Sequence, residues 1–137
     1  MTATIAAVDT RLIRIPLSRA WGADVTEIHV IEVIVTDSDG ATGFGFSWTP
    51  TIGAHAVHQL LAHDITDFAL GKDADPQIWT SAWTHLHEAG GGGITTIALA
   101  GLDLALWDLQ ARRAGQSITE FIGRRHTSLP AYGSGVN

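Results

Sequence analysis

The sequence predicts an α+β fold in which a three-stranded antiparallel meander is followed by a bundle of helices. Three β-type segments come in succession between residues 5 and 47, before any helical pattern begins. Helical periodicity then runs, with interruptions, from residue 54 to residue 123. The 137 residues are 45% apolar and 16% charged, which is typical of one ordinary globular domain.

The three predicted strands differ in how clearly they alternate. Residues 5–17 are rich in β-branched side chains and form the first strand. Residues 18–28 contain a glycine and show no period, so they are predicted to be a loop. Residues 29–36 alternate between two apolar faces, residues 37–40 have the composition of a turn, and residues 42–47 form the third strand.

The helical part of the chain contains four predicted helices after an irregular stretch at residues 48–53. The first covers residues 54–61, and an Asp75-Pro76 pair marks the start of the second. The third and longest covers residues 94–115. A capping box, Ser117-x-x-Glu120, opens a short fourth helix.

The long helix is the segment around which the rest of the chain is organised. Its apolar residues follow the i, i+3, i+4, i+7 spacing and also occur on the other sides, which predicts a helix enclosed almost all round. Gly101 permits close approach of another backbone, and Asp108 is spaced to pair with Arg112. Asp103 is a charge among leucines and therefore needs a partner, whether it supports a neighbouring loop or has a functional role.

The C-terminal residues 129–133 are predicted to form a short strand. No segment follows that could pair with it or cover it before Asn137. We therefore expect further structure to follow this sequence in the complete protein.

Composition excludes several classes of function. The net charge of −6 and the absence of a basic stripe argue against a nucleic-acid partner. There is no cysteine, which excludes thiol chemistry and favours a cytoplasmic location. The N-terminus lacks the features of a signal peptide, and no apolar segment is judged long enough to span a membrane. We expect a soluble protein.

Local motifs offer little catalytic chemistry. His55 and His58 are spaced to share a helical face, but too few acidic or thiol ligands lie near them, so we expect structural roles. Gly43-x-Gly45 lacks the third glycine and the helix start of a dinucleotide fingerprint. The glycine run 90–93 could bind an anion at a helix N-terminus, but a flexible connector is favoured.

Five tryptophans fall into two groups. Trp79, Trp83 and Trp107 lie at the spacing of helical core positions. Trp21 and Trp48 lie in stretches predicted to be irregular, where a large aromatic side chain indicates contact with another molecule or domain.

The long helix and its continuation, AGLDLALWDLQARRAGQSITEFIGRR, resemble the end of the N-terminal domain of the mandelate racemase and muconate lactonizing group in the enolase superfamily. The family pattern is Ala/Ser-x-x-Asp-x-Ala-x-Trp-Asp followed by a basic residue and a glycine. The matching residues are Asp103, Ala105, Trp107, Asp108, Arg113 and Gly115. The resemblance implies an enolase-type capping domain over residues 1–126, with residues 127–137 as the start of a (β/α) barrel.

In this family the barrel binds Mg²⁺ through carboxylates and removes the proton α to a substrate carboxylate. The resemblance implies an acid-sugar dehydratase or an α-hydroxy-acid racemase. Its partners would be its own C-terminal barrel, a small carboxylate substrate and, in the full-length protein, further copies of itself. This chain would hold no catalytic residue and no metal ligand, and would be inactive alone. The alternative from the residues is a stand-alone α+β binding module, which a stop codon after Asn137 would favour.

Two capping loops cover the substrate in this family, and the resemblance places them here by position. The implied substrate-binding residues are Trp21, Gly22, Ala23, Ser47, Trp48, Thr49 and Ser134. The two tryptophans would form apolar walls that exclude water from the pocket.

Overall fold

The computed structural model describes residues 2–50 and 52–133. Three strands, β1 (Ile5–Trp21), β2 (Val25–Asp37) and β3 (Thr42–Thr49), form one antiparallel sheet in the order β1-β2-β3. The predicted meander is confirmed.

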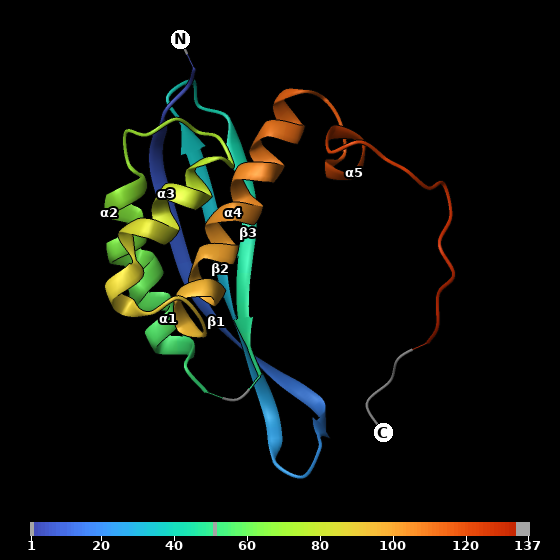
Figure 1. Ribbon diagram of the computed structural model, residues 1–137. Helices are drawn as coiled ribbons and strands as arrows, with labels where there is room; N and C mark the ends of the chain where they lie inside the picture. The colour runs from blue at the N-terminus through green and yellow to red at the C-terminus, as the bar shows by residue number, and fades with distance from the viewer. Residues whose placement is uncertain (1, 51, 134–137) are drawn as a thin grey trace.

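The predicted loop at residues 18–28 is wrong, because β1 and β2 continue through it as a two-stranded ribbon. Pairing runs from Pro16 opposite Glu27 to Trp21 opposite Val25, with a register shift between these two pairs. The ribbon extends beyond the end of β3, whose Thr49 pairs with His29, and projects away from the helices (Figure 1). A strand with no buried face has no hydrophobic alternation, so the period-2 signal is absent there.

The helices are α1 (Ala54–Leu60), a π-helical turn (Leu61–Ile65), α2 (Thr66–Ala69), α3 (Ile78–His85), a 3₁₀ turn (His87–Ala89), α4 (Ile94–Arg113) and α5 (Ile118–Phe121). The first predicted helix extends past Leu61 because Ile65 and Ala69 continue its buried stripe. Asp75 caps the turn before α3 by accepting a hydrogen bond from the Gln77 N–H, so regular helix begins slightly later than predicted. The capping box of Ser117 and Glu120 is confirmed.

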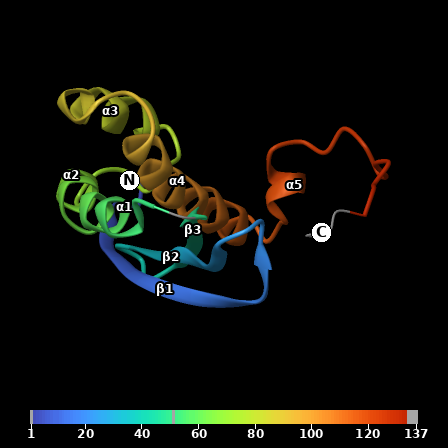
Figure 2. The ribbon, with the colours of Figure 1, turned by 90° about the horizontal axis from the view of Figure 1, so that it is seen from below.

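All the long helices cover one face of the sheet (Figures 1 and 2). Helix α4 runs along β3, and α1 and α2 lie over the side of β1. The core fills the space between these layers and includes Ile31, Val33, Val57, Leu102 and Leu106, all almost fully buried. No helix among the described residues covers the opposite face of the sheet (Figure 2).

Helix α4 and strand β3 touch backbone to backbone. A Cβ atom on Gly43 would lie 2.1 Å from the Ala105 carbonyl oxygen, and one on Gly45 would lie 2.2 Å from the Gly101 carbonyl oxygen. Only glycine permits this approach. The Gly43-x-Gly45 pair is therefore a helix-packing feature, and the expected close approach at Gly101 is confirmed.

Charged side chains of α4 hold the sheet at two points. The Arg113 guanidinium contacts Asp37, with Nε 3.0 Å from a carboxylate oxygen, and also pairs with Asp39. The predicted pair of Asp108 and Arg112 is present at 2.6 Å. The Asp108 carboxylate also accepts the backbone N–H of Phe44 at 2.8 Å, which satisfies a donor on the free edge of β3.

The prediction that α4 is enclosed almost all round is wrong. Leu104 is 37% exposed, Ala100 is exposed and Trp107 is half-buried. Trp79 is exposed and Trp83 half-buried, so the three helical tryptophans are not fully buried core residues. One side of α4 is open because the sheet and the other helices lie against its remaining sides.

By length and composition, α4 could cross a membrane, which corrects the expectation that no segment is long enough. Half of its most apolar window is buried inside the protein. We therefore interpret α4 as the core helix of the domain.

The predicted strand at residues 129–133 is wrong, because these residues are exposed and have no regular structure. After α5 the chain runs away from the domain and back toward the level of the ribbon (Figure 1). A strand needs a neighbour for its hydrogen bonds, and none of the described strands lies beside this segment.

Candidate functional site

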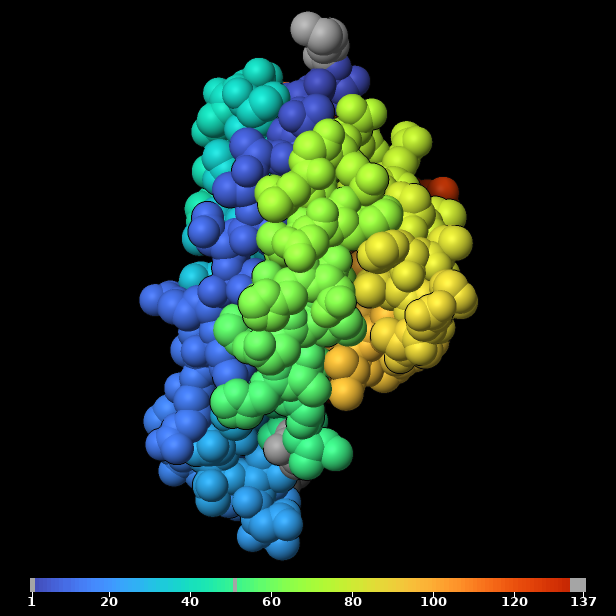
Figure 3. Space-filling model, turned by 90° about the vertical axis from the view of Figure 1, so that its left-hand side faces the viewer, coloured from blue at the N-terminus to red at the C-terminus, as the bar shows by residue number. Residues whose placement is uncertain are grey.

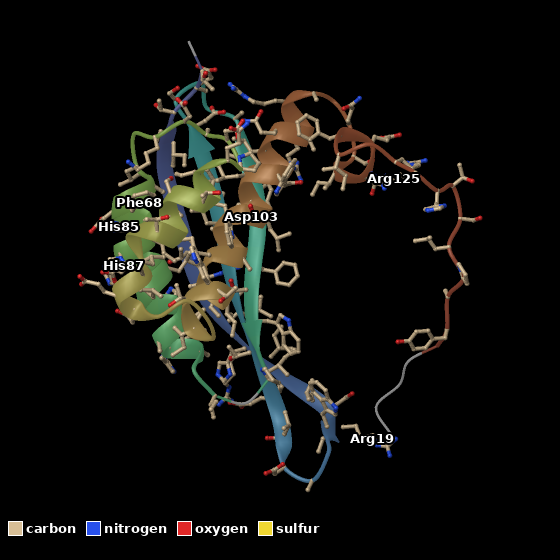
Figure 4. The ribbon with its side chains drawn as sticks, in the orientation of Figure 1. Arg19, Phe68, His85, His87, Asp103 and Arg125 are labelled. Carbon is tan, nitrogen blue, oxygen red and sulfur yellow. The ribbon has the colours of Figure 1, made fainter. Side chains whose placement is uncertain are left out.

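The β1–β2 ribbon forms the lower projection of the molecule in Figure 3. Its tip is a tight turn in which Gly22 has a φ of 68°, a conformation that glycine adopts without strain. Ala23 follows it on the exposed turn. Arg19 lies near the same end of the ribbon (Figure 4). The ribbon thus carries the first set of predicted site residues away from the core.

Trp21 and Trp48 come together at the base of this tip. Trp21 is the last residue of β1, and Trp48 is the penultimate residue of β3, so both lie in strands and not in the predicted loops. Their rings stack with centroids 6.4 Å apart and planes inclined by 21°. Each tryptophan is still 43% exposed. The pair forms an apolar surface that nothing in the described chain covers.

Strand β3 continues this surface upward. Phe44, Phe46 and Trp48 alternate with residues that face α4, and they are 46%, 51% and 43% exposed. A cavity of about 330 Å³ lies at the edge between β3 and the open side of α4, where Phe46 and Trp48 meet Ile97 and Leu104. The aromatic row and the open side of α4 are therefore one continuous apolar surface.

The same alternation turns two predicted site residues inward. Ser47 is buried, and its hydroxyl donates a hydrogen bond to the Ile97 carbonyl oxygen in α4. Thr49 is also buried. The Ser47 side chain contacts α4, and Ser47 also lines the cavity beside Trp48. Trp48 is the residue of this segment whose side chain faces outward. Ser134 lies outside the described residues.

A second cavity, of about 360 Å³, lies at the ribbon tip itself. It is lined by Trp21, Gly22, Asp24 and Val25 from the ribbon and by Pro50 from the segment after β3. The two segments that the sequence places at the substrate therefore meet around one hollow. Asp24, Val25 and Pro50 lie within the two capping loops that the resemblance implies, at residues 19–25 and 47–53, but were not among the predicted substrate-binding residues.

His55 and His58, the candidate metal ligands of the sequence, lie in α1 on the helix-covered face of the sheet. The His58 ring is 3.1 Å from the Thr10 hydroxyl. The His29 and His55 rings are 6.4 Å apart, and His29 Nε2 is 3.8 Å from a Glu27 oxygen. Among residues 2–50 and 52–133, no three His, Cys, Asp or Glu side chains gather in a way that could hold a metal ion.

Asp103 lies on the open side of α4, away from the ribbon (Figure 4). Burial raises the pKa of its carboxyl, and a hydrogen bond from Trp107 offsets part of that rise. It lines a cavity between α4, α5 and the turn before α3.

Among the described residues, the aromatic surface carries no assembled acid–base pair. The domain exposes an apolar wall and a ribbon tip. The meander, the long helix crossing it and the capping-box helix define an α+β domain of the enolase N-terminal type.

Comparisons with known proteins agree with this class. Residues 1–123 match the family described as mandelate racemase / muconate lactonizing enzyme, N-terminal domain. The chain is 38% identical to the 3,6-anhydro-alpha-L-galactonate cycloisomerase of Streptomyces coelicolor, over 97% of this chain and 38% of that protein. It is 30% identical to the L-talarate/galactarate dehydratase of Salmonella typhimurium, over 79% of this chain and 27% of that protein.

The fold also matches a crystal structure of the Salmonella typhimurium dehydratase liganded with Mg and L-lyxarohydroxamate. The TM-score is 0.83 at 28% identity, covering 91% of this chain and 34% of that one. The chain belongs to the mandelate racemase and muconate lactonizing enzyme family of the enolase superfamily, and corresponds to its N-terminal domain. It spans about a third of the length of these relatives.

Proposed function

We propose that this domain caps the active site of a Mg²⁺-dependent enzyme that removes the proton α to a carboxylate. The reaction is dehydration of an acid sugar or racemisation of an α-hydroxy acid. The relatives support the reaction class, since their names include an acid-sugar dehydratase and a cycloisomerase of a sugar acid. The catalytic groups and the metal ligands belong to a C-terminal barrel.

The observation that carries the proposal is the exposed stack of Trp21 on Trp48. Two large rings from strands far apart in sequence meet at the surface, where burial against a partner is the favourable outcome. Covered by the barrel and a bound substrate, the rings exclude water from the reacting carboxylate. Exclusion of water strengthens the electrostatic interactions on which this chemistry depends.

The described residues do not fit a Mg²⁺ site, because no three carboxylate or histidine side chains converge among them. Bound Mg²⁺ would stabilise the negative charge that develops on the substrate carboxylate. The role of this chain is to orient the distal end of the substrate with Trp21, Gly22, Ala23 and Trp48. This role determines which acid sugar is accepted.

The experiment is to extend the chain through its natural C-terminal continuation and assay it with Mg²⁺ on a panel of sugar acids in D₂O. We expect deuterium incorporation or dehydration with the extended protein, loss of activity with EDTA and recovery with Mg²⁺. The 137-residue chain should be inactive under the same conditions. Activity of this chain alone, or a natural protein that ends at Asn137, would contradict the proposal.

A further inference from the structure

Asp103 is the charged residue on the open side of α4 that makes no ion pair within the described part of the chain. It is half-buried, beside Leu104 and Trp107. Its hydrogen-bond partner is the neutral Trp107 indole, and burial raises the pKa of its carboxyl. A partly buried carboxylate with a neutral partner is less stable than one paired with a cation.

The carboxylate faces a space large enough for another side chain. A cavity of about 380 Å³ separates α4 from α5 and from the turn before α3, which is many times the roughly 30 Å³ occupied by one water molecule. Trp107 and Phe121 give it aromatic walls, and their rings meet edge to face with centroids 6.1 Å apart. Aromatic faces beside a carboxylate favour a cation, above all a guanidinium.

Two other polar groups of this cavity have hydrogen-bond partners in the domain. The Asp75 carboxylate accepts the Gln77 N–H at 2.8 Å, and the Gln110 amide donates to the Ala74 carbonyl oxygen. Asp75 forms no ion pair among the described residues either, so the cavity carries two carboxylates without a cation, and Asp103 is the one on α4.

Three arginines near this end of the domain have partners elsewhere in the described structure, while a fourth, Arg125 just after α5, forms no ion pair with Asp103 or any other described carboxylate (Figure 4). Arg112 pairs with Asp108, Arg113 with Asp37 and Asp39, and Arg124 with Glu120. Within the described structure, these three arginines do not supply the counter-ion for Asp103.

We propose that the cavity between α3, α4 and α5 receives an arginine or lysine side chain from the C-terminal domain, with the Asp103 carboxylate as its counter-ion. The inference rests on the proposed function, since it requires that domain to lie against the open side of α4. The pair fixes the position of the cap on the barrel. Asp103 is thus a positioning residue, remote from the ribbon tip and from the reacting atoms.

The test compares Asp103→Asn in two proteins, the 137-residue chain and the chain extended by its C-terminal domain. In the extended protein we expect the melting temperature to fall by more than about 5 °C, because a buried cation loses its partner. In the short chain it should stay within about 1 °C of the parent or rise, because an unpaired carboxylate has been removed.

Asp108→Asn is the matched control, one helical turn along α4. Its partners, the Phe44 N–H and Arg112, both lie inside this domain, so its melting temperature should fall in both proteins. Asp103→Glu keeps the charge and should restore part of the stability that Asp103→Asn removes from the extended protein. This variant provides a second reading if the asparagine variant does not fold.

An equal fall for Asp103→Asn in both proteins would overturn the inference, since Asp103 would then act within the domain. No fall in the extended protein would overturn it as well. These melting curves need no substrate, so an extended protein that is inactive on every sugar acid contradicts the proposed function and leaves the result on Asp103 readable.

Discussion

The two faces of β3 are built for different purposes. Toward α4 the strand presents Gly43, Gly45 and Ser47, which let the helix backbone lie directly on the strand. Away from α4 it presents two phenylalanines and Trp48, each more than 40% exposed. The inner face specifies the fold, because no side chain larger than a hydrogen atom fits at Gly43 or Gly45. The outer face carries apolar area that the described domain leaves uncovered.

Stability and function are therefore expected to depend on different faces of this strand. A substitution on the inner face must disturb the helix–sheet contact, because the neighbouring atoms are backbone and cannot move aside. A substitution on the outer face removes a ring that has few neighbours within the domain. Its effect should therefore appear mainly when the proposed barrel and substrate are present.

The largest expected effect is that of Gly45→Ala. The new Cβ would lie 2.2 Å from the Gly101 carbonyl oxygen and 2.5 Å from the Ala105 nitrogen. We expect the free energy of unfolding to fall by more than about 3 kcal/mol, measured by urea denaturation. Phe46→Ala, on the other face of the same strand, should cost about 1 kcal/mol or less. Equal losses would erase the distinction between the two faces.

A smaller effect is expected where α4 holds the end of the sheet through charge. Arg113→Gln leaves the fully buried Asp37 carboxylate without its cation. We expect a loss of about 2 kcal/mol in the same denaturation experiment, reduced from the value for a wholly buried pair because Arg113 is partly exposed. Arg112→Gln breaks a more exposed pair and should cost less than about 0.5 kcal/mol. If Arg112→Gln were as damaging as Arg113→Gln, burial of the partner would not be the cause.

The smallest expected effect is the pH dependence of the capping box that begins α5. Hydrogen bonds from the Ser117 side chain and backbone, then the charge of Arg124, lower the pKa of the Glu120 carboxyl. A lowered pKa means that the capping box stabilises α5 above the ordinary carboxyl pKa and loses this effect as pH falls through the lowered one. Amide chemical shifts of Ser117 and Glu120 should report this transition. The pH transition in these chemical shifts should be absent in the Glu120→Gln variant. A transition that persists in this variant would belong to another titratable group.

The sequence predicts those parts of the fold in which one face of an element is buried. In β2 the residues Ile31, Val33 and Val35 are fully buried under the helices, while the residues between them on the opposite face are half-buried. The capping box and the end of α4, with Gly115 at a φ of 65° just beyond Arg113, depend on local chemistry, so they are predicted directly from the residues. The family motif gains a physical reason as well, since Asp108 and Arg113 hold the edge and the end of the sheet.

The failures have one common cause. The ribbon at residues 18–28, the inward side chains of Ser47 and Thr49 and the open side of α4 all depend on which surfaces remain uncovered in space. Periodicity in a sequence does not distinguish an apolar residue buried in its own domain from one that faces another body. Ser47 and Trp48 are neighbours in the chain, and only the direction of each side chain shows which one reaches outward.

Trp48→Ala is the most direct test of whether the outer face of β3 serves substrate selection and not the fold. Two quantities are measured in the extended, active protein: the melting temperature and the substrate preference. We expect the melting temperature of the Trp48→Ala variant to stay close to that of the parent protein. The ratio of kcat/KM values between preferred and non-preferred sugar acids should shift by about 1–3 kcal/mol in equivalent free energy. Leu106→Ala, a fully buried substitution in α4, should do the reverse: a large loss of stability with unchanged substrate preference. If Trp48→Ala lowers the melting temperature as much as Leu106→Ala and leaves the preference unchanged, the outer face of β3 serves the fold and the account is wrong.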